Sequence, residues 1–187
     1  LNIFLNFTKK NQDKFAALGP RFLEVQEKSH KQINEKLKFG VIDSIHGSCM
    51  FINKEIFLKI GKFDENFFLY FEETEYCYRA KKKGYFSYQI NDIKVRTKGR
   101  TVDLENERNK NFSNILIWHF IWSRFYFSKK KYGKLLSIII FTPLLVRILL
   151  RIRWYKITNN EILLSKYVAR FEGLLKSMKG EKSSLRP

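Results

Sequence analysis

The sequence predicts an α/β domain followed by a basic helical extension. Over residues 1–110, short apolar segments bounded by glycine or proline alternate with segments of helical character, a pattern typical of α/β folds. From residue 111 onwards, long apolar segments with helical spacing dominate. A chain of 187 residues suits one domain with an appendage. We therefore predict one domain over residues 1–110 and a helical extension over residues 111–187.

The first elements are predicted from apolar spacing and turn residues. Apolar residues recur near helical spacing over residues 1–18, which favours a helix. Residues 16–22 have the composition of a short buried strand, and Gly19-Pro20 predicts a turn that breaks it. The polar residues 24–38 predict a solvated loop or a frayed helix, in which His30 is expected to be a surface residue.

The middle of the chain alternates between turn-bounded strands and short helices. Asparagine favours the N-cap of a helix and glycine favours its C-terminal end, so these residues set the expected limits. We expect a turn into a strand over residues 42–52, a helix over 53–60 from Asn53 to Gly61, a helix over 72–83 that ends at Gly84, and a strand over 85–95 with a turn at Asn91-Asp92.

The C-terminal part has two predicted helices, over residues 112–132 and about 160–179. Between them, residues 135–146 carry no charge and contain Pro143. A membrane-spanning helix needs roughly 20 apolar residues. This shorter run therefore predicts an interfacial or re-entrant segment rather than a full span.

Charge is concentrated in the C-terminal part. The net charge is +18, with 21 Lys+Arg against 15 Asp+Glu in residues 1–110 and 15 against 3 in residues 111–187. Such an excess suits an anionic membrane surface or nucleic acid. The absence of a helix-turn-helix or RNP-like pattern, and the aliphatic runs beside the charges, argue against nucleic acid. We therefore expect an anionic membrane surface as a partner and no nucleic acid.

The two cysteines and the chain start indicate the compartment. Cys49 and Cys77 are too few for a disulfide scaffold and lack metal-binding spacing, so we expect a reducing compartment and no metal ligands among them. The opening residues show no secretory signal. Because the chain begins with Leu rather than Met, we expect it to be a fragment.

The stretch Gly61–Arg79 is the candidate site. It places three carboxylates, Glu72, Glu73 and Glu75, directly after a run of aromatic residues. Burial and neighbouring charge both raise the pKa of a carboxyl group, as an active-site acid or base requires. The alternative is the solvated first turn of a helix, where acidic residues are favoured by the helix dipole.

The order of motifs resembles the C-terminal half of inverting family 2 glycosyltransferases with the GT-A (Rossmann-like) fold. The rhamnosyltransferase-like branch, which builds bacterial surface polysaccharides, is the most similar. The resemblance covers roughly residues 15–187, and its motifs lie at Gly19–Arg21, Gly47–Phe51, Gly61–Phe68, Glu72–Tyr76 and Tyr78–Gly84.

The resemblance implies a role for each carboxylate. Glu73 stands at the position of the family's catalytic base, which removes the proton of the acceptor hydroxyl. Glu72 and Glu75 would then hold acceptor hydroxyls or adjust the pKa of the base. Arg79 lies four residues after Glu75, so a local ion pair between them is the alternative.

Small and acidic residues around this position are candidate substrate contacts. Gly47, Ser48 and Cys49 would line the floor under the donor sugar or the acceptor, where small side chains allow close approach. Asp64 and Glu65 would contact the acceptor, with a loop cap as the alternative.

Two departures from the family pattern concern the donor. Arg96 stands where the family usually has a metal-binding His, and arginine pairs with phosphate rather than with a metal. The family's N-terminal nucleotide-binding half and its D-x-D motif are not found in this sequence. A divalent cation (Mg or Mn) is therefore expected only in a full-length protein, and we expect this chain to be inactive alone.

The resemblance as a whole implies an inverting glycosyltransferase of cell-surface polysaccharide biosynthesis. Its donor would be a nucleotide-diphosphate sugar, with rhamnose suggested by the branch, and its acceptor a lipid-linked or polysaccharide molecule. The basic, aromatic extension places it at the cytoplasmic face of the cell membrane, in a peripheral or interfacial position. The alternative is a catalytically inactive, membrane-docking relative of the same scaffold.

Overall fold

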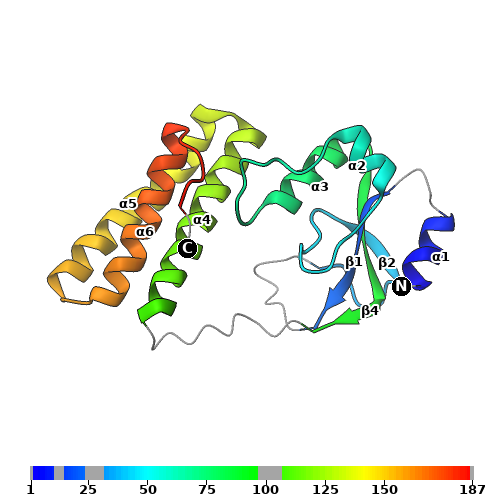
Figure 1. The fold of residues 1–187 in the computed structure, drawn as a ribbon, viewed down its shortest axis with the longest axis horizontal. Coiled ribbons are helices and arrows are strands. Elements are labelled where there is room, and N and C mark those ends of the chain that lie inside the picture. The colour runs from blue at the N-terminus through cyan, green and yellow to red at the C-terminus, as the bar shows by residue number, and fades with distance from the viewer. Residues whose placement is uncertain (1, 11–14, 24–31, 97–106, 186–187) are drawn as a thin grey trace. The chain divides into compact units, whose positions relative to one another are not determined.

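The computed structural model describes residues 2–10, 15–23, 32–96 and 107–185, and these form two compact units. An α/β unit comprises residues 1–64 and 72–101, and a helical unit comprises residues 65–71 and 102–187 (Figure 1). The segment 65–71 belongs to the helical unit although it precedes the acidic cluster in sequence.

The elements follow one another in the order expected for an α/β domain with helices after it. They are α1 (Asn2–Lys10), β1 (Phe15–Phe22), β2 (Phe39–Ile42), β3 (Phe51–Ile52), α2 (Lys54–Ile60), α3 (Glu72–Lys82), β4 (Phe86–Val95), α4 (Glu107–Tyr132), α5 (Lys134–Ile157) and α6 (Glu161–Lys179).

The sheet has four strands in the order β2-β4-β1-β3. Strands β1 and β4 run parallel, with Leu18 opposite Tyr88, and the other two pairs are antiparallel. A parallel pair needs a crossover connection, and the chain between β1 and β4 includes the helices α2 and α3. The carboxyl ends of β1 and β4 therefore lie at the same edge of the sheet.

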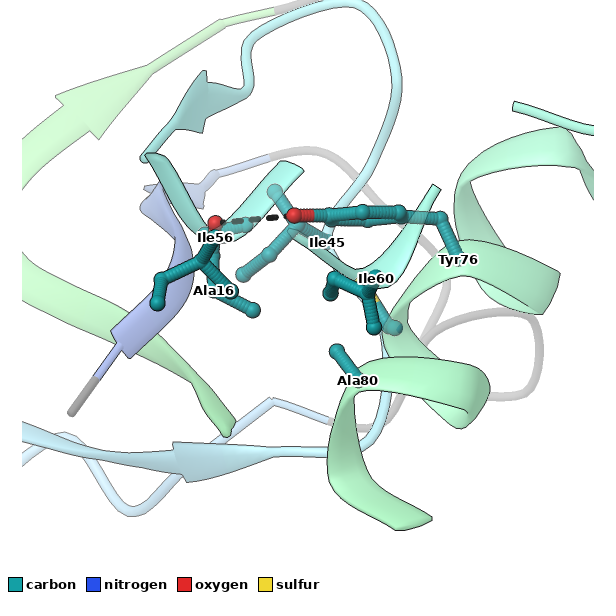
Figure 2. Packing of buried hydrophobic residues seen from close by; sticks show 8 residues of the cluster. Ala16, Ile45, Ile56, Ile60, Tyr76 and Ala80 are labelled. Atoms are coloured by element: carbon teal, nitrogen blue, oxygen red, sulfur yellow. Dashed lines mark hydrogen bonds between the residues drawn. The ribbon is translucent and has the colours of Figure 1, made fainter. Parts of the chain in front are cut away.

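One hydrophobic core lies between the sheet and the helices α2 and α3. The hydroxyl of Tyr76 donates a hydrogen bond of 3.4 Å to the carbonyl of Ala16 across this core (Figure 2). Burial raises the pKa of this tyrosine, so the group remains a neutral donor. The labelled side chains of the cluster are Ala16, Ile45, Ile56, Ile60, Tyr76 and Ala80.

A second core joins α1 to the sheet. Phe4 of α1 packs with Phe15, Leu18 and Ile90, and its ring stacks on Phe51 at 5.6 Å between centroids. These contacts use side chains of β1 and explain why the predicted helix over residues 1–18 is wrong in its second half. The helix ends at Lys10 within the described residues, and Phe15 and Leu18 lie in the strand.

Strand β1 continues through Gly19-Pro20, so the predicted turn is wrong. A Cβ atom on Gly19 would lie 2.5 Å from Cγ2 of Ile45, so glycine is needed here for close packing rather than for a turn. Strand β3 pairs only with Ala17 and Leu18, so the missing N–H of Pro20 removes no bond from that ladder.

Strand β4 also continues where the sequence predicted a turn at Asn91-Asp92. The pairing of β1 with β4 shifts at this point, from Pro20 opposite Ile90 to Arg21 opposite Lys94. The turn-forming residues therefore form an irregularity in a continuous strand. The predicted loop residues 24–31, including His30, and most of residues 96–110 lie outside the described residues.

The helical unit packs α4, α5 and α6 against one another (Figure 1). Its largest buried side chains are Trp118, Trp122 and Phe125 of α4, each at most 2% exposed. Helices α4 and α6 approach closely at Gly173, where a Cβ atom would lie 2.5 Å from the carbonyl oxygen of Trp118. The small residue at this position therefore sets the distance between the two helices.

Segment 65–71 packs onto α4. The ring of Phe67 lies 5.0 Å from that of Tyr126, and the hydroxyl of Ser123 donates a hydrogen bond of 2.7 Å to the carbonyl of Leu69. The ring of Phe71 stacks on Phe127 at 5.7 Å. Within the aromatic run, the rings that contact α4 are those of Phe67, Phe68, Tyr70 and Phe71. Phe63 packs instead against Phe57 and Tyr76 in the α/β unit.

Helix α5 is continuous through Pro143 and has the length and composition needed to cross a membrane. Only 17% of its most apolar 18-residue window is buried within the chain. Five of its exposed aliphatic residues recur at intervals of four and seven, which places them on one face of the helix. They are Leu135, Ile139, Val146, Leu150 and Ile157, with exposed fractions between 50% and 79%.

Candidate active site

The candidate site lies in the α/β unit, where the first turn of α3 faces the loop 43–50. The residues before α3, Tyr70 and Phe71, have φ angles of 67° and 70°, which few non-glycine residues adopt. Such strained backbone is often found next to functional residues. Glu72, Glu73 and Glu75 then follow in the first turn of the helix.

Glu73 is directed toward the loop that contains Gly47. A Cβ atom placed on Gly47 would lie 3.9 Å from Cδ and Oε2 of Glu73. The hydroxyl of Thr74 donates a hydrogen bond of 3.2 Å to Oε1 of Glu73, and Ser44 Oγ lies 3.0 Å from the same hydroxyl. The structure therefore brings together the two residues that the sequence singled out as base and floor, and adds Ser44 and Thr74 as supports.

The environment of Glu73 changes its acidity. Burial is the main cause that raises the pKa of this carboxyl group, and the negative charge of Glu72 adds to it. Hydrogen bonds from the Glu73 and Thr74 backbone and from the Thr74 hydroxyl act in the opposite direction. A carboxylate with a raised pKa is a stronger proton acceptor than an exposed one, as a general base requires.

Glu72 lies beside this group and has an unsatisfied acceptor. Its Oε2 is buried without a hydrogen-bond partner among the described residues, although the residue as a whole is half-buried. A buried acceptor without a partner costs free energy. A hydroxyl group of a bound molecule would satisfy this oxygen.

Glu75 has a structural partner. Both of its carboxylate oxygens accept from Nε of Arg79, at 2.9 and 3.0 Å, and the side chain is 1% exposed. The remaining nitrogens of Arg79 donate to the carbonyls of Ile60, Gly61 and Lys62. The geometry thus favours the local ion pair, which ties the end of α2 to α3, over a contact of Glu75 with substrate.

His46 is a residue of this loop that the sequence did not single out. Its Nδ1 lies 2.8 Å from Ser48 Oγ and accepts a hydrogen bond from the Ser48 backbone N–H at 3.3 Å. Because that nitrogen accepts, the proton of a neutral ring resides on Nε2. Burial lowers the pKa of His46, which favours this neutral form. In the sequence, the feature that could have identified His46 as a site residue is its position directly before Gly47.

The other predicted contact residues lie in different environments. Cys49 is a half-buried free thiol, and its N–H closes the turn onto the carbonyl of His46 at 3.1 Å. Asp64 is half-buried, whereas Glu65 is exposed and belongs to the helical unit. Arg96 is exposed directly after β4. Contacts of these four side chains with substrate remain predictions.

No group of three or more His, Cys, Asp or Glu side chains among the described residues could hold a metal ion. The buried Cys77, whose pKa is raised by burial, lies in the core rather than in the site.

One stretch of the chain is similar to a glycosyltransferase, which supports this class of enzyme for the chain. The relative is the low-salt glycan biosynthesis hexosyltransferase Agl10 of Haloferax volcanii, with 50% identity over 42 residues. The match covers 22% of this chain and 14% of that protein. No family model matches the chain, and no solved structure matches it.

Proposed function

We propose that this chain forms the catalytic, acceptor-side part of an inverting family 2 glycosyltransferase with the GT-A fold. It would transfer a sugar, with rhamnose as the candidate, from a nucleotide-diphosphate donor to a lipid-linked or polysaccharide acceptor of the cell surface. The observation that carries this proposal is the position of Glu73, a partly buried carboxylate that faces Gly47. The similarity to a hexosyltransferase supports the same class.

In the proposed reaction, Glu73 acts as the general base. An acceptor hydroxyl above Gly47 would donate its proton to a carboxylate oxygen of Glu73 as its oxygen attacks the anomeric carbon of the donor. The bond from that carbon to the diphosphate breaks on the opposite side, and the nucleoside diphosphate leaves with the electron pair. Attack from the side opposite the leaving group inverts the anomeric configuration.

Neighbouring residues would orient the base and the acceptor. Thr74 and Ser44 form a hydrogen-bonded chain to Glu73 that fixes the carboxylate, and a fixed base lowers the cost of reaching the reactive geometry. The buried oxygen of Glu72 would accept a hydrogen bond from a second acceptor hydroxyl. The absence of a side chain on Gly47 leaves the space in front of the carboxylate open to the sugar.

The helical unit would hold the enzyme at the cytoplasmic face of the membrane. The exposed apolar face of α5 (Leu135, Ile139, Val146, Leu150 and Ile157) lies on a helix that also carries Arg147, Arg151 and Arg153. An apolar face with basic residues beside it suits the interface of an anionic bilayer. The same face is the observation that favours the second candidate, an inactive relative that only docks to membranes.

The test is sugar transfer by the complete gene product. Wild type and Glu73→Gln are supplied with a panel of nucleotide sugars, a membrane extract as acceptor, and Mg²⁺, Mn²⁺ or EDTA. Release of nucleoside diphosphate by the wild type, reduced about 10²- to 10⁴-fold in the variant, is the expected result. Glu55→Gln is the matched control, because Glu55 is an exposed carboxylate on α2.

Two outcomes would count against the proposal. If Glu73→Gln transfers sugar at the rate of Glu55→Gln, Glu73 is not the base. If the wild type consumes no donor under any metal condition but still binds anionic vesicles, the membrane-docking relative is the better description. Circular dichroism of each variant would show that a loss of rate is not a loss of fold.

A further inference from the structure

The turn that faces Glu73 is closed by a hydrogen bond to a histidine ring. The backbone N–H of Ser48 donates to Nδ1 of His46 at 3.3 Å, and the Ser48 hydroxyl lies 2.8 Å from the same nitrogen. The N–H of Cys49 also closes this turn, because it donates to the carbonyl of His46 at 3.1 Å. Gly47 lies between these partners, so both bonds fix the residue that faces the candidate base.

The bond from the Ser48 N–H to His46 has the spacing of an Asx turn. In an Asx turn, the side-chain oxygen of asparagine or aspartate accepts from the backbone two residues further along the chain. Two asparagines of the α/β unit, Asn34 and Asn53, make this contact at 3.0 and 3.1 Å. In His46 a ring nitrogen takes the place of the oxygen. An imidazole nitrogen gains a proton near neutral pH, whereas an amide oxygen does not.

The ring of His46 is held in an environment without charged neighbours on one side. Phe22 of β1 packs against it, with 5.0 Å between the ring centroids. The ring also lines a small cavity of about 10 Å³, whose other polar side chains are Gln32, Ser44 and Gln89. None of these neighbours is titratable. Glu73 of α3 faces the turn across Gly47, and the thiol of Cys49 follows in the turn itself.

Protonation of the ring would break its contact with the backbone. Neutral His46 accepts at Nδ1, and burial lowers its pKa, so the neutral form is favoured at pH 7. An imidazolium has an N–H group at both nitrogens and no acceptor. The Ser48 hydroxyl can turn and accept from Nδ1–H, but the Ser48 backbone N–H remains a donor. Two donors would then face each other across the 3.3 Å that now separate donor and acceptor.

We propose that His46 is a positioning residue for Glu73. As a neutral acceptor it holds the turn with Gly47 in front of the carboxylate, and protonation of its ring releases the turn. This role rests on the proposed function, because the turn forms the floor on which the acceptor hydroxyl would meet Glu73. Two protons therefore stop the reaction at low pH, one on the base and one on His46.

The first test measures the contact itself, by NMR of the 187-residue chain. The ring nitrogen shifts should show the proton of neutral His46 on Nε2. The Ser48 amide shift should follow the titration of His46, with a midpoint below about 6.5, the usual value of a histidine. In His46→Asn the amide should show no such titration and should keep its protection from hydrogen exchange. In His46→Ala that protection should fall about tenfold, because one hydrogen bond is lost.

The matched control for this measurement is Asp43→Ala. Asp43 begins the same loop, and its side chain is 85% exposed. The Ser48 amide of this variant should titrate and exchange as in the wild type. A general loosening of the loop by any substitution would instead change the control as well, and would overturn the specific role of the ring.

The second test is sugar transfer by the complete gene product. His46→Ala should lower kcat/KM about tenfold. His46→Asn should restore most of it, because the amide oxygen accepts the same backbone N–H. On the acid side, log kcat/KM of the wild type should fall with a slope of about two against pH, one proton for Glu73 and one for His46. In His46→Asn the slope should be about one.

Several results would overturn the proposal. A Ser48 amide that does not follow His46, or a neutral ring protonated on Nδ1, would show that the ring does not hold the turn. Equal rates in His46→Ala and the wild type would show that the turn does not position the base. A slope of about two in His46→Asn would assign the second proton to another group. If the complete protein transfers no sugar while the Ser48 amide follows His46, the proposed function fails and the pH-dependent contact remains.

Discussion

The α/β unit and the helical unit differ in the side chains that are unfavourable where they lie. The first buries a charged residue, and the second exposes apolar residues. In the α/β unit, the charged Glu75 is 1% exposed and receives its partner, Arg79, from the same helix. In the helical unit, apolar side chains such as Leu135 and Ile157 are 79% and 69% exposed in the part of the chain that the structure describes. In the α/β unit the buried carboxylate is paired with an arginine of the same unit. The helical unit instead has an exposed apolar surface, and such surfaces are typical of interaction sites. We infer that the chemistry belongs to the α/β unit and attachment to the helical unit.

Tryptophan separates the two units experimentally. All three tryptophans, Trp118, Trp122 and Trp154, lie in the helical unit. Tryptophan fluorescence therefore follows unfolding of that unit, and hydrogen exchange of the β1 and β4 peptides follows the other.

The largest effect on stability is expected from Arg79→Met. The variant leaves the carboxylate of Glu75 buried without its partner and removes the bonds to three carbonyls, so the α/β unit should lose about 3–5 kcal/mol. Hydrogen exchange of β1 and β4 should accelerate while the tryptophan transition in urea stays in place. Lys81→Met, which loses only an exposed pair with Asp43, should cost about 1 kcal/mol or less.

Gly173→Ala is expected to destabilise the helical unit and to leave the α/β unit unchanged. The added methyl group would lie 2.5 Å from the carbonyl oxygen of Trp118, so α4 and α6 must separate, at a cost of about 1–3 kcal/mol. The tryptophan transition should move to lower urea, and exchange in β1 and β4 should not change. Glu172→Ala, an exposed substitution one residue away, is the control. A shift of both transitions together would show that the two units unfold as one.

An asparagine substituted on the exposed face of α5 should weaken binding to membranes and leave the stability of the fold unchanged. Leu150→Asn removes an apolar group that is 64% exposed, so the tryptophan transition should change little. Its affinity for vesicles with anionic lipid should fall about tenfold, since burying a leucine side chain is worth roughly 1.5–3 kcal/mol. Leu58→Asn, at a leucine that is 60% exposed in the α/β unit, should bind vesicles as the wild type does. Equal losses would show that α5 has no special role.

Of these substitutions, Glu73→Gln is expected to change the free energy of unfolding least. Because the folded state raises the pKa of Glu73, the protonated form is favoured by folding and the ionised form is not. The stabilising contribution is complete below the unfolded pKa and is lost as the pH rises through the folded value. The neutral variant should therefore be more stable than the wild type at pH 8, by less than about 1 kcal/mol, and equal to it near pH 3. A loss of stability at pH 8 would contradict the burial of an ionised carboxylate here.

Local signals in the sequence determined the ends of several helices, although the helix predicted over residues 1–18 was wrong in its second half and α5 was expected to be an interfacial or re-entrant segment. Asn53 accepts hydrogen bonds from the N–H groups of Glu55 and Ile56, as its predicted role as N-cap requires. Gly180 adopts the left-handed conformation that ends α6. These features depend on neighbours within one or two turns, so a single sequence reveals them. The roles expected for Glu73 and Gly47 had a different origin, since they followed from the resemblance to a family, and only the structure placed the two residues near each other.

The tertiary structure alone determined where turn-forming residues do not form turns. Turn-forming residues at Gly19-Pro20 and Asn91-Asp92 lie inside continuous strands, because packing against Ile45 and pairing between β1 and β4 outweigh their local preference. The aromatic residues directly before α3 pack with α4 through partners about fifty residues away, as in the hydrogen bond from Ser123 to the carbonyl of Leu69. Partners at such separation have no fixed spacing in sequence. Burial of Glu75 and exposure of α5 likewise depend on the complete fold, because each is a property of surfaces that the chain brings together.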